Sequence, residues 1–149
     1  MSVENHKLEA RIRKAFACNA PLSTPLPYDF SEMNHKISRY ANSYVRKYLP
    51  LLLIKEMESE QRSPTSTGDH LIYFLDGYLL ARQGDTHSYK TLLDIQQKTF
   101  ADFGREEAQA ILKWLEIIAF PKYRDLCADD LDSAIKYWRD KALETVGSQ

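Results

Sequence analysis

The sequence predicts an all-α protein, a single-domain helical bundle or irregular array of six to seven helices. Apolar residues recur along most of the chain with a period of about 3.6 residues, which is the period of an α-helix. The 5 glycines and 6 prolines are few, and the prolines cluster between the periodic segments. A chain of 149 residues, 44% of them hydrophobic, fits one globular domain with its own core. We therefore expect a single domain over residues 1–149.

The first predicted helix runs from about Val3 to Cys18. Ser2 precedes it and suits the N-cap position, where a hydroxyl accepts a hydrogen bond from the first turn. Its apolar stripe consists of Leu8, Ile12, Ala15 and Phe16. The stretch from Asn19 to Tyr28 contains three prolines, each of which removes a backbone donor and disfavours helix before it. We expect a Pro-rich connector there.

The segment after this connector predicts the most regular helix of the chain. Asp29 followed by Glu32 has the layout of a capping box, which opens a helix. One arc of this helix is apolar and carries Met33, Ile37, Tyr40, Ala41, Tyr44, Val45 and Tyr48. The opposite arc is basic and carries Lys36, Arg39, Arg46 and Lys47. We expect the tyrosine rings to face the core and the basic side chains to face outward.

Pro50 predicts a break or sharp kink near Leu49, because proline suits the first turn of a new helix better than the interior of an old one. The third helix would then pass through Leu51 to Met57, and its four consecutive aliphatic residues indicate that it is covered on most sides. The stretch from Ser59 to Asp69 has the composition of a turn and predicts a flexible loop.

The apolar run from Leu71 to Ala81 fits either a buried helix or a strand, because a short continuous run does not distinguish them. Its length favours a helix, and Asp69 can cap it. Gly77 and several β-prone residues favour a strand. We expect a helix, because the remaining elements are all helical.

Three more helices complete the prediction. They span about residues 88–99, 105–119 and 129–145, and Pro121 is expected to end the second of them. Acidic residues open the last two, where the helix dipole favours them. The inward stripes of these last two helices consist of Ala108, Ile111, Leu112, Leu115, Ile118, Leu131, Ala134, Ile135, Trp138 and Ala142.

Charge and hydropathy predict a cytoplasmic protein that does not enter membranes. The net charge of −1 argues against generic adhesion to nucleic acid or to an anionic membrane. The N-terminal stretch is charged throughout and lacks the apolar region of a signal peptide. The longest aliphatic run, Leu51 to Ile54, is far shorter than the roughly 20 residues of a membrane span. Cys18 and Cys127 have no ligand or disulfide spacing, so we expect two reduced thiols.

No catalytic residue, metal site or cofactor is predicted. The chain has no glycine-rich phosphate loop, and its histidines never lie four residues apart on one helix. Cys127 precedes a predicted helix N-terminus, but no base is placed beside it. The acids around Asp129 lack the glycine and terminal glutamate of a calcium loop and fit a helix start instead. An enzyme remains an alternative if His70 and His87 converge with their neighbouring acids.

The four basic side chains Lys36, Arg39, Arg46 and Lys47 form the candidate binding patch. In one interpretation, the acids between Asp102 and Asp132 fold against this patch and neutralise it. In another, the patch is exposed and binds a protein partner with an acidic surface. Nucleic acid is a third, less favoured ligand. The sequence alone leaves these interpretations open and does not predict the oligomeric state.

Two stretches resemble a known family. KYLPLLLI and EEAQAILKWLEIIAF, together with Ala15 and Phe16 in the first helix, resemble a family of small uncharacterised bacterial all-helical proteins, a domain of unknown function. The resemblance implies a bacterial, cytosolic, all-α protein and brings no activity with it. We expect a non-catalytic protein–protein interaction module of immunity or inhibitor type in the bacterial cytoplasm. The alternatives are the enzyme and a nucleic-acid-binding accessory protein.

Overall fold

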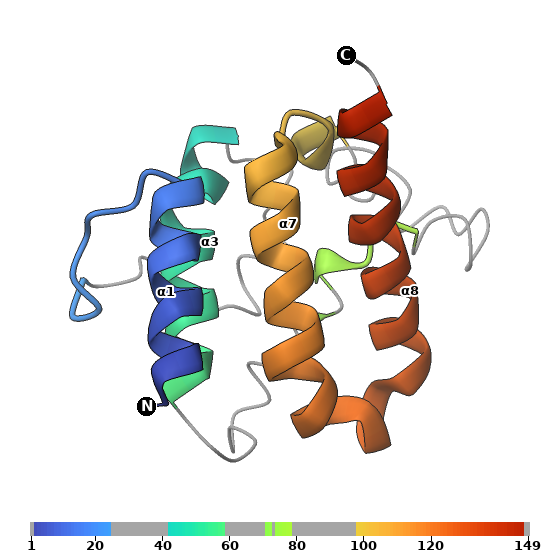
Figure 1. The fold of residues 1–149 in the computed structure, drawn as a ribbon, viewed down its shortest axis with the longest axis horizontal. Helices are drawn as coiled ribbons and strands as arrows, with labels where there is room; N and C mark the ends of the chain where they lie inside the picture. Colours follow the sequence, from blue (N-terminus) through green and yellow to red (C-terminus); the bar gives the residue numbers. More distant parts are fainter. Residues whose placement is uncertain (1, 25–41, 59–70, 73, 79–97, 148–149) are drawn as a thin grey trace.

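Helices that run side by side make up the described chain (Figure 1). The structure, a computed structural model, describes residues 2–24, 42–58, 71–72, 74–78 and 98–147. Side chains are described from Lys47 onward in the second of these stretches and up to Leu143 in the last. These residues form α1 (Val3–Ala15), α3 (Asn42–Glu58), α7 (Arg105–Trp114) and α8 (Phe120–Gly147), with the π-helical segment η2 (Leu115–Ala119) between the last two. No strand occurs among them, which confirms the all-α class. The described part contains four α-helices rather than six to seven, and the predicted helices that fall on residues 29–41 and 88–97 lie outside the described residues.

Helix α1 begins as the sequence predicts. The Ser2 hydroxyl accepts a 3.1 Å hydrogen bond from the N–H of Asn5, and Leu8 and Ile12 are buried. The helix ends at Ala15 rather than at Cys18, because Ala17 adopts a left-handed conformation with φ 52°. Residues 19–24 contain no helix, and the rest of the predicted connector lies outside the described residues.

Helix α3 is continuous through Pro50, so of the predicted break or sharp kink near Leu49 the break is wrong. A proline inside a helix removes one backbone hydrogen bond and destabilises it by about 3 kcal/mol. Here the surrounding packing offsets that loss, because Pro50 and the aliphatic residues from Leu49 to Ile54 are all buried. α3 lies against α1 (Figure 1).

The helix that starts at α7 also continues past its proline. Pro121 is the second residue of α8, directly after η2, and the helical backbone continues past it. Before it the chain forms the π-helical turn η2, in which the Phe120 N–H bonds the carbonyl of Leu115. The helical backbone is interrupted later, at Cys127, with φ −139° and ψ 49°. The prediction that Pro121 ends the helix is therefore wrong, and Cys127 marks the turn at which α8 reverses direction beside α7 (Figure 1).

Two tryptophans connect the helices. The indole N–H of Trp114 donates to the Leu53 carbonyl at 2.9 Å, which joins α7 to α3. The indole N–H of Trp138 donates to the Leu75 carbonyl at 2.8 Å, which joins α8 to the segment at residues 71–78. Both rings are fully buried, so each contributes a large apolar surface and a satisfied donor.

The remaining predicted core is confirmed where it is described. Leu71, Ile72, Phe74 and Leu75 are helical and buried, so the helical interpretation of that run is right for these residues. The predicted inward stripes of α7 and α8 are buried, except for the half-buried Leu112. The loop predicted from Ser59 to Asp69 lies outside the described residues. Within the described part, the helices are too short or too polar to cross a lipid bilayer.

Candidate functional site

The structure describes little of the basic patch predicted from the sequence. Lys36 and Arg39 lie outside the described residues, and Arg46 is described only as part of the α3 backbone. Lys47 is exposed, and its Nζ lies 5.3 Å from the ring centroid of Tyr48, which is a cation–π contact. The patch therefore stays a prediction.

The two histidines of the alternative enzyme site, His70 and His87, also lie outside the described residues. Among the residues that are described, no three His, Cys, Asp or Glu side chains gather in a way that could hold a metal ion. The enzyme alternative therefore also stays a prediction.

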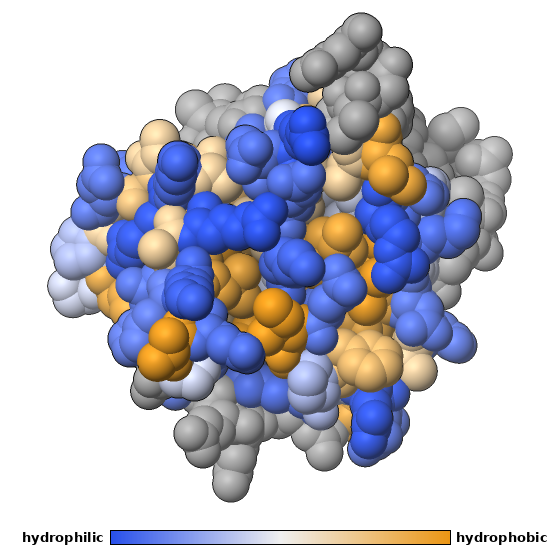
Figure 2. All heavy atoms as spheres, viewed as in Figure 1, coloured by the Kyte–Doolittle hydropathy of each residue, from blue (hydrophilic) through white to orange (hydrophobic). Residues whose placement is uncertain are grey.

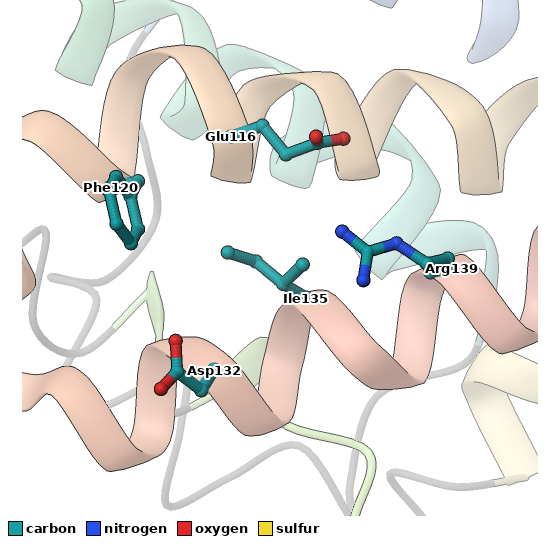
Figure 3. A pocket seen from close by; sticks show the side chains of 5 residues that line it. All are labelled: Glu116, Phe120, Asp132, Ile135 and Arg139. Carbon is teal, nitrogen blue, oxygen red and sulfur yellow. The ribbon is translucent and has the colours of Figure 1, made fainter.

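A surface pocket of about 440 Å³ lies between η2 and α8 (Figure 3). Its described lining consists of Glu116, Phe120, Asp132, Ile135 and Arg139, and we call this the η2–α8 groove. A volume of this size is in the range of sites that take a small ligand or a few side chains of a partner.

The two helices that border the groove run in opposite directions, and this sets the order of its residues. Figure 3 shows Phe120 and Asp132 at one end, Glu116 and Arg139 at the other, and Ile135 between them. On α8, Asp132, Ile135 and Arg139 share one face because they are three and four residues apart.

Phe120 and Ile135 supply the apolar surface of the groove. Ile135 is 9% exposed and forms its floor, whereas the Phe120 side chain is 38% exposed. Phe120 follows directly on η2, and such π-helical turns are frequent at functional sites because they change the register of the side chains beyond them. Figure 2 shows apolar atoms reaching the surface on the face of α7 and α8 in small areas separated by hydrophilic side chains.

The three charged side chains of the groove are exposed. Within the described part of the chain, no side chain forms a hydrogen bond or an ion pair with Glu116, Asp132 or Arg139. Their neighbours on α8 differ, because Lys136 and Asp140 form an ion pair at 3.6 Å. The groove therefore offers an apolar floor surrounded by exposed charged side chains.

Glu56 is a second candidate, and its surroundings give it a structural role. Its carboxylate is 5% exposed and accepts a 2.5 Å hydrogen bond from the Tyr123 hydroxyl. Lys122 donates to the Glu56 backbone carbonyl at 2.7 Å and pairs with its carboxylate at 3.4 Å. These contacts join α3 to α8 in the interior, so this carboxylate is committed to partners within the protein.

Asp76 is a second buried acid with internal partners. Its carboxylate is fully buried and accepts hydrogen bonds from the Ser133 hydroxyl at 2.6 Å and from the Tyr78 N–H at 3.1 Å. The Tyr78 hydroxyl in turn donates to Asp140 at 2.6 Å. That hydrogen bond, together with the positive charges of Lys136 and Arg139, holds the pKa of Asp140 below its ordinary value despite some desolvation.

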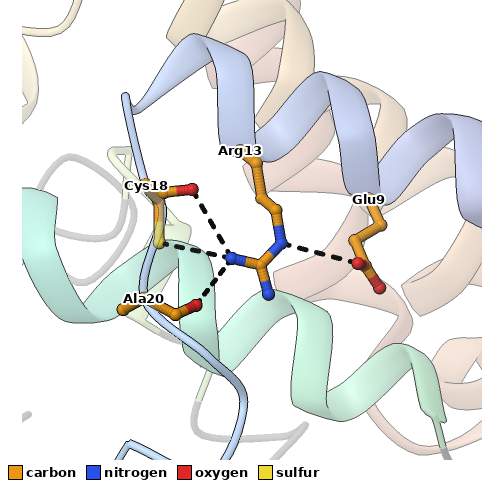
Figure 4. A network of polar contacts seen from close by, with 4 residues as sticks. All are labelled: Glu9, Arg13, Cys18 and Ala20. Carbon is orange, nitrogen blue, oxygen red and sulfur yellow. Dashed lines mark hydrogen bonds and ion pairs between the residues drawn. The ribbon is translucent and has the colours of Figure 1, made fainter.

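Arg13 organises the segment that follows α1 (Figure 4). Its guanidinium donates to the carbonyls of Ala20 at 2.7 Å and Cys18 at 3.5 Å, and it pairs with Glu9 at 3.5 Å. The buried Cys18 sulfur lies 4.0 Å from the same guanidinium nitrogen.

The other thiol, Cys127, is half-buried and donates to the Tyr123 carbonyl at 3.5 Å. Both cysteines are free, as predicted.

The sequence analysis did not identify the buried acids Glu56 and Asp76 or the η2–α8 groove. Glu56 follows Leu53 by three residues and therefore falls on the buried face of α3. That spacing could have identified it. Phe120 and Asp132 carry no comparable local signal, because their proximity depends on the reversal of the chain at Cys127.

No protein-family model, curated protein or solved structure matches this chain.

Proposed function

We propose that this protein is a non-catalytic protein–protein interaction module that binds its partner in the η2–α8 groove. The observation that carries the proposal is the combination of an apolar floor, Phe120 and Ile135, with three charged side chains that form no hydrogen bond or ion pair among the described residues. Interfaces concentrate binding energy where a partner side chain fills an apolar pocket and polar groups surround it.

The state of the buried acids supports binding over catalysis. A catalytic acid or base must reach the proton that it transfers, and its site leaves it accessible to the substrate. Glu56 and Asp76 are buried and accept hydrogen bonds from Tyr123 and Ser133, so their positions favour a structural role. The charged side chains of the groove are accessible, and they surround apolar side chains that suit a protein surface.

The proposal extends to an immunity or inhibitor role in the bacterial cytoplasm, which follows from the resemblance of KYLPLLLI and EEAQAILKWLEIIAF to a bacterial all-helical family. A module of this type acts by covering a surface of its partner. Binding through a preformed groove fits that role, because a rigid site loses little conformational entropy on association. A partner with an acidic surface for Lys36, Arg39, Arg46 and Lys47 is a separate part of the proposal.

Site-specific photo-crosslinking tests the groove. The protein is produced in its source cells with p-benzoyl-phenylalanine at Phe120, where the aromatic ring is retained, or at Val3, a 71% exposed residue on α1, as the matched control. We expect the crosslinker at position 120 to form a covalent adduct with one defined second protein. The crosslinker at position 3 should form no adduct with that protein. The same adducts from both positions, or no adduct from position 120, would show that the groove is not the binding site.

A further inference from the structure

We infer that the segment bound in the η2–α8 groove is a cationic amphipathic helix of the partner, with a Lys or Arg beside Asp132 and Phe120 and an aliphatic side chain on Ile135. This inference rests on the proposed function and names the class of partner. It follows from the charges of the groove, from a similar arrangement elsewhere in the molecule and from the spacing along α8.

The charges of the groove leave one carboxylate uncompensated. Glu116 and Arg139 lie at the same end, and their opposite charges cancel there (Figure 3). Asp132 lies at the other end, where the described lining contains no base. The described lining of the groove therefore carries one net negative charge, at the end where Phe120 lies. Charge complementarity calls for a cation in the ligand at this end.

An aromatic ring next to that carboxylate selects the kind of cation. Phe120 lies at the same end as Asp132 (Figure 3), and a ring face attracts an ammonium or guanidinium group. The long stem of a Lys or Arg also packs on apolar surface while its charged head reaches an acid. A lysine or arginine side chain satisfies both groups at once, whereas a hydrated metal ion gains nothing from the ring.

The molecule already contains this combination with its cation in place. On the same helix, Lys136 lies with its Nζ 5.2 Å from the ring centroid of Tyr78 and 3.6 Å from the carboxylate of Asp140. An aromatic ring, a carboxylate and a lysine thus meet at one point. Phe120 and Asp132 place a ring and a carboxylate at one end of the groove, without the hydroxyl that joins Tyr78 to Asp140, and the partner supplies the lysine.

The spacing on α8 indicates a helix as the ligand. Asp132 and Ile135 are three residues apart, which is about 4.5 Å along the helix axis. A partner helix laid along the groove presents side chains three or four residues apart at the same interval. A basic residue and an aliphatic residue at that spacing would therefore reach Asp132 and Ile135 together.

A defined peptide tests this inference. The probe is a 15-residue acetylated and amidated Ala/Gln helix that carries one Lys and, three residues later, one Leu. It is titrated into the uniformly ¹⁵N-labelled full chain, and amide shifts are followed by NMR up to several mM, since a single pair of anchors gives dissociation constants on the order of 1 mM. We expect shifts that saturate and that concentrate at residues 116–120 and 132–139.

Matched variants separate the contribution of the cation from nonspecific binding of the peptide. Replacing the peptide lysine by norleucine, or introducing Asp132→Asn into the protein, should weaken binding about tenfold. Asp129→Asn, an exposed acid of the same helix outside the groove lining, should leave binding unchanged. The spectra of the free variants report directly whether each remains folded.

Three results would overturn the inference. The first is the absence of groove shifts with the Lys–Leu peptide, and the second is tighter binding of a Glu–Leu peptide. The third is groove shifts that grow with protein concentration alone, because a second copy of this chain would then be the occupant. If the crosslink at position 120 succeeds while the peptide fails, the binding function stands and the cationic helix is wrong. If the peptide binds while the crosslink fails, the chemistry of the groove is right and its use for a cellular protein is wrong.

Discussion

The phenolic hydroxyl of Tyr123 donates a 2.5 Å hydrogen bond to the buried carboxylate of Glu56. The two residues belong to α8 and α3, which are 67 residues apart in the sequence at this point. Lys122, next to Tyr123, adds an ion pair to the same carboxylate at 3.4 Å. A buried charge is tolerated only when such partners replace the water that it loses. This bond therefore should be among the more important polar contacts of the interior.

Tyr123→Phe removes this hydrogen bond while keeping the ring. Because the carboxylate of Glu56 stays buried, we expect the free energy of unfolding to fall by about 1–3 kcal/mol. Urea denaturation followed by circular dichroism measures the change. Glu58→Gln, at the exposed last residue of α3, should change it by less than about 0.5 kcal/mol. Equal unfolding midpoints for Tyr123→Phe and the unchanged protein would show that the bond contributes no stability.

Ser133→Ala tests the second buried acid in the same way. The Ser133 hydroxyl donates to the fully buried Asp76 at 2.6 Å, so its removal deprives a buried carboxylate of a donor. We expect a loss of about 1–3 kcal/mol in the free energy of unfolding. Asp132→Ala, at the exposed neighbouring position, is the control and should be within about 0.5 kcal/mol of the unchanged protein. A loss no larger than that of this control would contradict the assigned role of Ser133.

The pKa of Asp140 predicts how one surface contact responds to acid. The hydrogen bond from Tyr78, then the charges of Lys136 and Arg139, hold this pKa below its ordinary value. A carboxyl group with a lowered pKa in the folded state stabilises the fold above its unfolded pKa, near about pH 4. That stabilisation is lost as the pH falls through the lower, folded-state pKa.

Tyr78→Phe should therefore raise the pKa of Asp140 towards its ordinary value, because the largest cause of the shift is removed. A titration of the side-chain carboxyl carbon by NMR measures this directly. Lys136→Met should also raise this pKa, since Lys136 lowers it both through its charge and through a hydrogen bond. An unchanged pKa of Asp140 in Tyr78→Phe would contradict the role assigned to the Tyr78 hydroxyl.

Helical periodicity predicted most of the described fold. The stripes of α1, α7 and the last part of α8 are local, repeated patterns, and burial follows them closely. The two proline predictions failed because proline rules are also local. At Pro50 the buried aliphatic run stabilises a continuous helix, and at Pro121 the helical backbone continues directly after η2. In both places packing or register outweighed the local preference.

The groove was beyond sequence reasoning for a related reason. Ile135 was expected to face inward, and it does, but the identity of its neighbours depends on where the chain reverses. That reversal occurs at Cys127, a residue with no particular turn preference. Glu56 is different, since its spacing from Leu53 placed it on the buried face and could have been used.

Gly77→Ala tests the packing between α8 and the segment at residues 71–78. A Cβ added to Gly77 would overlap the ring of Tyr137. That ring cannot move away easily, because it packs against Tyr78 at 5.2 Å and Trp138 at 5.1 Å between ring centroids. We expect the free energy of unfolding to fall by about 1–3 kcal/mol, as is usual when a packed interior must accept an extra group.

A double-mutant cycle identifies the cause of that loss. In a Tyr137→Ala background the ring is absent, so Gly77→Ala should destabilise the protein by less than it does alone. The difference between the two effects, obtained from urea denaturation of the four proteins, measures the clash itself. An equal effect of Gly77→Ala in both backgrounds would place the strain in the backbone of residue 77 rather than in its contact with Tyr137. Because only the steric explanation depends on Tyr137, the cycle decides between the two.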